Sequence, residues 1–333
     1  MTARWANWAG DQICAPVLIQ RPASEQELIG VVHAAAERGQ PVRAVGAGHS
    51  FTDTALTDGV MIDTSALNRI LDIDRDRRTA TVQAGIRLHE LGRPLAQTGL
   101  ALENQGDIDR QSISGAISTA THGTGGGLRN LSAQIVALRI VTAGGEVIEV
   151  DAESDPETYL AARVSIGALG VISAVTIQCV PLYTLHRHDA PLPLQETLDR
   201  LDEHVDANDH FEFFVFPYTE LALTRRMRRS EEAPRPPAQW KRWVEEQLLE
   251  NNVLGALCRT GRRFPSLAPR LNRFIAGAVS EGRVEDRPYN VYATRRAVRF
   301  TEMEYAIPRQ HAREAVERVL ELVPRRRLPI LFP

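Results

Sequence analysis

The sequence contains almost no lysine. Lys241 is the single lysine, so nearly all of the 39 basic residues are arginine. This bias is typical of GC-rich codon usage and indicates a high-GC bacterium as the source. Acidic residues number 42, which gives a formal net charge of −3. A chain with this small negative charge gives no reason to expect nucleic acid or an anionic membrane as its partner.

Cysteine is also scarce. Cys14, Cys179 and Cys258 are far apart and odd in number, which argues against a disulfide framework or a metal-binding cysteine pattern. We therefore expect a reducing, cytoplasmic location. No stretch approaches the ~18 apolar residues that a membrane-spanning helix needs. The N-terminus has no basic region followed by an apolar run, so no signal peptide is expected.

What the sequence does contain predicts a two-domain α+β protein. With 333 residues, of which 43% are hydrophobic, the chain is long enough for about two domains. Ser24 and Glu27 form a capping box before an apolar stripe, which predicts a helix up to Gly39. Alternating patterns predict hairpins over residues 70–85 and 135–150. Because strands come in hairpins interspersed with helices, we expect α+β rather than a doubly wound parallel sheet.

The second half repeats this mixture of elements. Its patterns predict strands over 210–218, 221–229 and 298–309. Helices are expected over 193–207, 239–278 and 311–323, and a buried strand is expected from Leu328 to Phe332.

The stretch `VRAVGAGHSF`, residues 42–51, is the first candidate site. A strand runs into Gly46 and Gly48, and His49 follows. Successive N–H groups in a glycine-relaxed turn make a concave anion site that suits a pyrophosphate. The Rossmann fingerprint fails here, because the third glycine and the following helix are missing. The alternative is a tight turn with a hydrogen-bonded histidine.

The stretch `SISGAISTATHGTG`, residues 112–125, is the second candidate site. Its side chains are so small that a large flat ligand could lie against the backbone, and its Ser and Thr hydroxyls could bond phosphate or ring heteroatoms. The alternative is a glycine-rich turn between strands. Two such loops in one α+β domain favour a nucleotide cofactor. No metal site is predicted, because His186 and His188 have no third ligand at a useful spacing.

Three ordered segments carry a family resemblance: `VRAVGAGHSFTDTALTDGVMIDTSAL` (42–67), `LENQGDIDRQSISGAISTATHGTG` (102–125) and `VSIGALGVISAVTIQCVPL` (164–182). They resemble the PCMH-type FAD-binding domain of the vanillyl-alcohol oxidase superfamily, and within it the aldonolactone oxidoreductases. The resemblance implies an FAD-binding domain of two α+β subdomains over residues 1–183. An incomplete α+β substrate (cap) domain would follow over residues 184–333.

The resemblance also implies the residues of the site. The first loop would wrap the FAD pyrophosphate, and His49 would reach the flavin, where family members bond it covalently or leave it free. Ser112 matches a serine that faces the substrate, so it is the catalytic candidate. The positions implied to contact FAD are Gly46, Ala47, Gly48, His49, Ser50, Phe51, Ser112, Gly115, Ser118, Thr119, His122, Gly123, Gly170, Val171 and Ile172.

The implied reaction is oxidation of a sugar 1,4-lactone at C2, such as L-gulono- or D-arabinono-1,4-lactone. Hydride would pass to flavin N5 and the product would be ascorbate or its analogue. The final electron acceptor would be oxygen or another oxidant. Two alternatives stay open: an alditol oxidase acting on open-chain polyols, and an FAD-binding fragment without catalysis.

The sequence departs from the family at its C-terminus. The resemblance places the family's Glu-x-Arg pair on the strand just beyond `LPILFP`, and a His-Trp-Gly-Lys segment further on, so neither lies in these 333 residues. We therefore expect that the natural protein continues beyond Pro333, and that this chain binds FAD weakly or not at all and turns over poorly.

Overall fold

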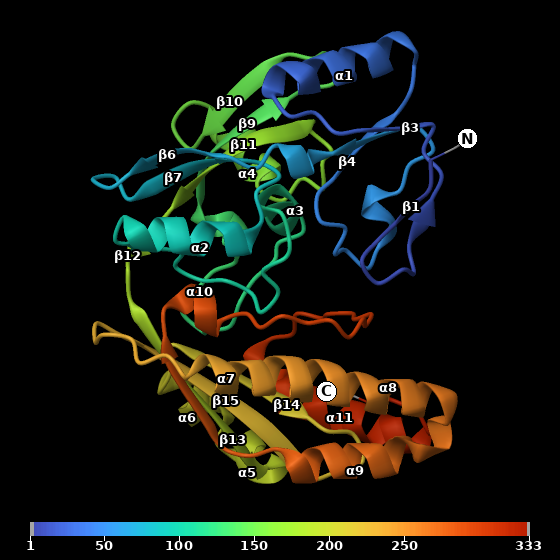
Figure 1. The fold of residues 1–333 in the computed structure, drawn as a ribbon, viewed down its shortest axis with the longest axis vertical. Coiled ribbons are helices and arrows are strands. Elements are labelled where there is room, and N and C mark those ends of the chain that lie inside the picture. Colours follow the sequence, from blue (N-terminus) through green and yellow to red (C-terminus); the bar gives the residue numbers. More distant parts are fainter. Residues whose placement is uncertain (1–2, 332–333) are drawn as a thin grey trace. The chain divides into compact units, whose positions relative to one another are not determined.

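The computed structural model describes residues 3–331, and the chain divides into two units (Figure 1). Unit 1 comprises the chain up to Gly123, together with Leu128–Leu182 and Arg299–Glu302. Unit 2 comprises Thr124–Gly127, Tyr183–Val298 and the chain from Met303 onward. The assignment of residues 1–183 to FAD and of 184–333 to the substrate stays a prediction.

Unit 1 begins with a small parallel sheet in the order β3-β5-β4. Helix α1 (Glu25–Glu37) connects β3 to β4, and Ser24 caps it by accepting a hydrogen bond from the Glu27 N–H at 3.2 Å. The predicted helix and its cap are therefore confirmed. The strands are β3 (Leu18–Gln20), β4 (Val42–Val45) and β5 (Val60–Asp63).

A five-stranded antiparallel sheet in the order β10-β9-β11-β7-β6 forms the other layer of unit 1. Both predicted hairpins are confirmed as β6–β7 and β9–β10. The strands are β6 (Ile70–Asp74), β7 (Thr79–Gln83), β9 (Ile135–Val141), β10 (Val147–Asp151) and β11 (Val171–Gln178). Short pairs join β1 (Trp5–Ala6) to β2 (Ile13–Cys14) and β8 (Leu100–Ala101) to β12 (Val180–Pro181).

Buried side chains join these layers. Leu28, Val32 and Ala35 on α1 pack against Val141 and Val171 of the antiparallel sheet, in a cluster that also includes β5. The largest core cluster lies between the antiparallel sheet and helices α2 (Leu88–Gln97), α3 (Ile113–Ser118) and α4 (Pro156–Ala162). Burying each large apolar side chain stabilises the fold by roughly 1.5–3 kcal/mol. This packing holds the sheet against the start of α3.

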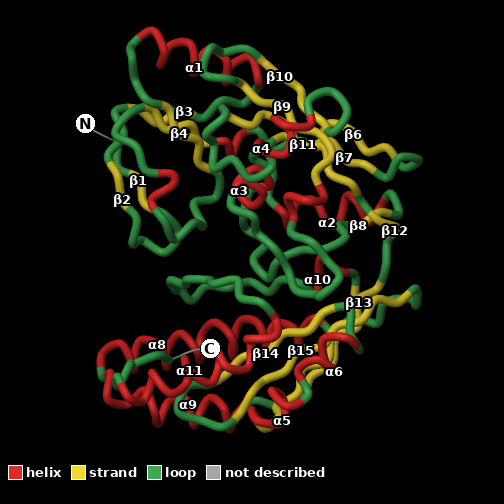
Figure 2. Tube along the Cα trace, turned by 180° about the vertical axis from the view of Figure 1, so that it is seen from behind, coloured by secondary structure: helices red, strands yellow, loops and turns green. Residues whose placement is uncertain are grey.

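Unit 2 is built on an antiparallel sheet in the order β14-β15-β13-β16 (Figures 1 and 2). Helices α5 and α11 pack on the face of this sheet that carries Phe213, Val215 and Ala222. The strands are β13 (Thr184–Pro193), β14 (His210–Val215), β15 (Leu221–Ser230) and β16 (Gly282–Asp286). The helices are α5 (Leu194–Asp199), α6 (Leu201–Asp206), α7 (Gln239–Trp243), α8 (Leu254–Arg263), α9 (Ala268–Ala278), α10 (Pro288–Val291) and α11 (Ala312–Arg325), with a π-helical stretch at Val244–Val253.

The α+β class is confirmed, but two predicted strands of the second half are wrong and one predicted helix is divided in two. Residues 298–309 form no strand: they pair with no strand of the described chain, and Met303 is 81% exposed. The expected strand at the end is also irregular and largely exposed over residues 328–331, while its last residues lie outside the described chain. The helix over 193–207 is interrupted at Arg200, whose φ of −109° and ψ of 20° separate α5 from α6.

Candidate functional site

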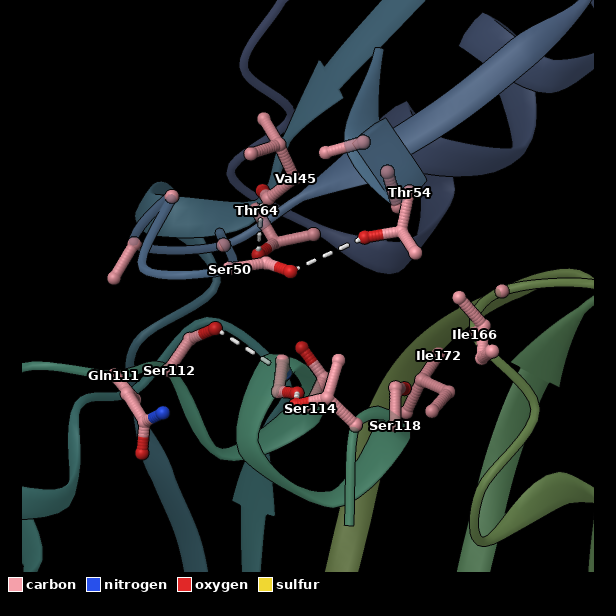
Figure 3. A pocket seen from close by; sticks show the side chains of 18 of the residues that line it. Val45, Ser50, Thr54, Thr64, Gln111, Ser112, Ser114, Ser118, Ile166 and Ile172 are labelled. Atoms are coloured by element: carbon pink, nitrogen blue, oxygen red, sulfur yellow. Dashed lines mark hydrogen bonds between the residues drawn. The ribbon is translucent and has the colours of Figure 1, made fainter. Parts of the chain in front are cut away.

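Unit 1 contains a cavity between the loop after β4 and the start of α3, and this cavity is partly open to solvent. Figure 3 shows Ser50, Thr54 and Thr64 on one wall, Gln111, Ser112 and Ser118 on the other, and Ile166 and Ile172 at one side. The structure thus brings both candidate loops together. The predicted site residues that line the cavity are Gly46, Ala47, Gly48, His49, Ser50, Ser112, Gly115, Ser118, Thr119, Gly170 and Ile172.

The loop after β4 presents free hydrogen-bond donors. Within the described residues, the backbone N–H groups of residues 47–50 donate no hydrogen bond. Gly48 has a φ of +67°, which glycine adopts without strain and other residues rarely do. Consecutive unpaired N–H groups of this kind form a site of positive potential that suits phosphate oxygens.

His49 lines the cavity and stacks on Trp8, with ring centroids 5.0 Å apart and an angle of 25° between the rings. Burial, followed by the positive charge of Arg87, lowers the pKa of His49 to about 4. The imidazole is therefore neutral near pH 7. Its Nδ1 atom is buried and has no hydrogen-bond partner in the described part of the chain, which is unusual for a buried polar atom.

The opposite wall corrects a prediction. The small-residue segment was expected to be a loop, but residues 113–118 form α3, because Ile113, Ala116 and Ile117 are buried in the core. Ser112 caps this helix by accepting a hydrogen bond from the Gly115 N–H at 3.3 Å. The N–H groups of Ile113 and Ser114 already donate to Ile86 and Ala84 carbonyls. The first turn of α3 is therefore not a free anion site.

Four predicted contact residues do not line the cavity. Phe51 lies against Phe300, with ring centroids 5.7 Å apart. His122 bonds through Nδ1 to the Gly123 carbonyl at 2.7 Å. A Cβ atom on Gly123 would lie 2.4 Å from Asn104 Oδ1, so this segment packs closely against residues 104–106. Val171 is only 6% exposed and belongs to the core.

Other residues reach the cavity without a clear signal in the sequence. Thr64 lines it and donates a hydrogen bond to the Val45 carbonyl at 3.3 Å. Gln111 lines it with a buried Oε1 atom that lacks a partner among the described residues. Ile166 adopts a φ of +53° beside it, a strained conformation for a β-branched residue. Arg43 and His49 are the only ionisable side chains among the described lining residues, so no carboxylate base lines this wall.

Two polar networks lie in unit 2. Arg225 binds Asp189 through two hydrogen bonds, of 2.9 and 3.1 Å, and Glu212 through a third of 3.2 Å. His210 is fully buried and bonds through Nδ1 to the Thr124 carbonyl at 3.0 Å and through Nε2 to the Tyr292 hydroxyl at 2.9 Å. Burial is the main reason that the pKa of His210 falls to about 4.

The structure shows neither a metal cluster nor a membrane helix in the part of the chain that it describes. Within residues 3–331, no three His, Cys, Asp or Glu side chains are placed to hold a metal ion. Each helix of that range is too short or too polar to cross a lipid bilayer.

Comparison with known families and relatives gives the chain its context. Residues 16–151 match the model of an FAD binding domain, and residues 175–333 match that of D-arabinono-1,4-lactone oxidase. The L-gulono-1,4-lactone dehydrogenase of Mycobacterium tuberculosis is 61% identical over all 333 residues, which span 77% of its length. The L-gulonolactone oxidase of Bos taurus is 34% identical, over 94% of this chain and 71% of its own.

The fold has solved counterparts. A cholesterol oxidase from B. sterolicum superimposes with a TM-score of 0.77 over 98% of this chain and 68% of its own. Because the identity is 17%, this likeness concerns the fold alone, and it agrees with the predicted FAD-binding fold. The two family models and the relatives named as lactone dehydrogenase or oxidase, whose similarity extends over both units, confirm the predicted family. The chain belongs to the aldonolactone oxidoreductases that are built on an FAD-binding domain.

Proposed function

We propose that this chain is an FAD-dependent oxidoreductase that oxidises a sugar 1,4-lactone, such as L-gulono- or D-arabinono-1,4-lactone, at C2. The observation that carries the proposal is the cavity of unit 1. One wall presents N–H groups at residues 47–50 that have no partner among the described residues, and the other presents the Ser112 hydroxyl. Both walls lie within residues 16–151, the stretch that matches an FAD binding domain.

The residues present fit FAD. The unpaired N–H groups suit a pyrophosphate, and the buried Nδ1 of His49 is a polar atom still without a partner in the described chain. Gly46, Gly48 and Gly115 would keep the backbone accessible, while Ser118 and Thr119 would add hydroxyl groups. When bound, the flavin supplies the electron sink for removal of hydride from the lactone.

The chain's own residues would bind the cofactor and position the lactone beside it. Ser112 Oγ lines the cavity and can hydrogen-bond a substrate hydroxyl, which makes it the candidate for orienting the lactone. Neutral His49 can accept or donate a hydrogen bond at the cavity wall. We propose that Phe51, His122, Gly123 and Val171 act behind these residues, as supports for the two walls.

The remaining assignments are part of the same proposal. Residues 1–183 would bind FAD and residues 184–333 would contribute the substrate side. Oxygen or another oxidant would take the electrons. The three separate cysteines agree with a cytoplasmic location.

Reconstitution tests the proposal. The purified chain is titrated with FAD, and flavin fluorescence and absorbance are followed. We expect saturable binding, which Gly46→Ala should weaken, and reduction of the bound flavin by L-gulono- or D-arabinono-1,4-lactone. Binding of FAD without its reduction by any lactone would mean that the chain is an FAD-binding module without catalysis. Reduction by alditols alone would favour a polyol oxidase, and no binding would refute the proposal.

The state of the cofactor is tested separately. Flavin colour that remains with the acid-precipitated protein, and that disappears in His49→Ala, would establish a covalent bond at His49. Complete release of the colour by acid would establish non-covalent FAD.

A further inference from the structure

The loop that carries His49 is held from outside the cavity by the N-terminal segment. The backbone N–H of Trp8 donates a hydrogen bond to the Gly48 carbonyl at 2.7 Å. Asn7 donates through Nδ2 to the Ser50 carbonyl at 3.0 Å, and Gln12 donates through Nε2 to the Phe51 carbonyl at 3.3 Å. These bonds use the carbonyl groups of the loop, while its N–H groups at residues 47–50 donate to no group in the described part of the chain.

A second segment, Arg299–Glu302, joins this arrangement although it is almost 250 residues further along the chain. Phe300 packs edge-on against Trp8, with ring centroids 5.3 Å apart, and tilted against Phe51 at 5.7 Å. Thr301 anchors the segment by donating a hydrogen bond to Asp11 at 3.1 Å. Trp8 is thus packed between His49 and Phe300.

The orientation of the His49 ring depends on this packing. The structure gives the His49 side chain no hydrogen bond within the described residues, so no polar partner fixes the plane of the ring. A stacked aromatic neighbour favours one orientation of the ring, because aromatic pairs prefer offset-stacked or edge-to-face arrangements. Trp8 is the stacked neighbour that the structure shows.

We propose that Trp8 and Phe300 are positioning residues for His49: Trp8 stacks on the imidazole, Phe300 supports Trp8, and together they fix the ring at the cavity wall for contact with bound FAD. The inference deepens the proposed function and rests on it for the contact with FAD. The neutral state of His49 is consistent with this role, because the aromatic cover excludes water. Arg87 is the charged group whose field acts on the ring, and it also disfavours protonation.

Histidine titration by NMR tests the positioning without any cofactor. The protein is labelled at histidine Cε1, and the His49 signal is identified by its loss in His49→Asn. In the wild type this signal should not titrate between pH 8 and pH 5. In Trp8→Ala and Phe300→Ala, water reaches the ring, and the pKa should rise by about one unit or more toward its usual value near 6.5. Trp8→Phe keeps an aromatic face and should behave as the wild type.

FAD titration of the same variants supplies the second readout. Trp8→Ala should bind FAD about three- to tenfold more weakly, as expected for the loss of one stacked pair. Trp243→Ala is the matched control, because Trp243 is 59% exposed and lies in unit 2. It should change neither the titration nor the affinity.

The outcomes separate the inference from the proposed function. Unchanged His49 titration and FAD affinity in both alanine variants would overturn the inference while the proposed function stands. A wild type that binds no FAD would overturn the proposed function, and the NMR titration would still decide whether Trp8 and Phe300 fix the ring. Should Trp8→Ala not fold, Phe300→Ala decides alone, and an unchanged His49 pKa in it would overturn the inference.

Discussion

Gly46 lies so close to Ser112 that no side chain fits between them. A Cβ atom on Gly46 would lie 1.8 Å from Ser112 Oγ. Gly46 directly follows β4, and Ser112 caps α3, so this contact is where the two walls of the cavity meet. The width of the cavity therefore depends on the absence of a side chain at position 46.

Gly46→Ala should destabilise the protein and weaken FAD binding. The added methyl group forces Ser112 or the loop to move, which typically costs about 1–3 kcal/mol. A displaced loop should also weaken FAD binding by about tenfold, the equivalent of 1.4 kcal/mol. Urea unfolding and flavin titration measure the two effects. Gly30→Ala is the control: nothing lies within 4 Å of its Cβ position in α1, and alanine there should stabilise by roughly 0.5–1 kcal/mol. Equal effects of both substitutions would contradict the prediction.

Ser112→Ala tests whether Ser112 acts only as the cap of α3 or also orients the lactone. Loss of the cap of α3 should lower the free energy of unfolding by about 0.5–2 kcal/mol. If Ser112 also orients the lactone, kcat/KM should fall by about tenfold or more. Ser24→Ala removes an equivalent cap at the start of α1, away from the cavity. We expect a similar loss of stability from Ser24→Ala with unchanged kcat/KM, and a matching fall in kcat/KM would refute the catalytic role of Ser112.

Asp189→Asn should be strongly destabilising. Burial opposes the charge of Arg225, but the hydrogen bonds and charge of Asp189, assisted by Glu212, raise the pKa of Arg225 above its usual value. Removing the carboxylate leaves a guanidinium that is only 15% exposed without its bidentate partner, which should cost about 3 kcal/mol. Glu317→Gln breaks the exposed pair with Arg313 and should cost less than about 0.5 kcal/mol. Chemical denaturation measures both, and similar losses would be evidence against the prediction.

Mild acid should destabilise the protein through His210. The pKa of this buried imidazole is lowered to about 4, whereas an unfolded histidine titrates near 6.5. Between these values the unfolded chain binds more protons, so the stability is fully present above pH 6.5 and is lost as the pH falls toward 4. From pH 7 to pH 5 we expect His210 alone to contribute a loss of about 2 kcal/mol in the free energy of unfolding. The pKa of His49 is also lowered to about 4, so this group adds its own loss of stability over the same pH range, and His210→Gln should reduce the pH dependence without abolishing it. An unchanged dependence would rule out His210 as a cause.

Local patterns in the sequence were sufficient for much of the fold. The helix at Glu25–Glu37 follows from its cap and apolar stripe. Both hairpins follow from alternation, with a charged turn in β6–β7 and turn glycines in β9–β10. Two glycine-rich segments were expected to share one ligand, and eleven of the predicted residues line one cavity. These features depend on neighbours in the chain, which a sequence displays directly.

Features that depend on distant neighbours were missed. Residues 112–118 resemble a loop in composition, and the helix there follows from burial of Ile113 and Ile117. Residues 298–309 alternate as a strand would, but a strand also needs a partner beside it, and none of the described strands supplies one. Phe300 packs on Trp8 although the two residues are far apart in the chain, and no local sequence pattern predicts this contact.

The interlaced chain affects how this protein can be recombined. Residues 299–302 belong to unit 1, although the residues before and after them in the sequence belong to unit 2. Conversely, Thr124–Gly127 belong to unit 2, although the residues on either side of them belong to unit 1. A chimaera joined at residue 183 would therefore receive its Phe300 from a different parent than its Trp8. In such hybrids, Trp8 should stay packed between His49 and Phe300 only when both parents carry matching aromatic residues at positions 8 and 300.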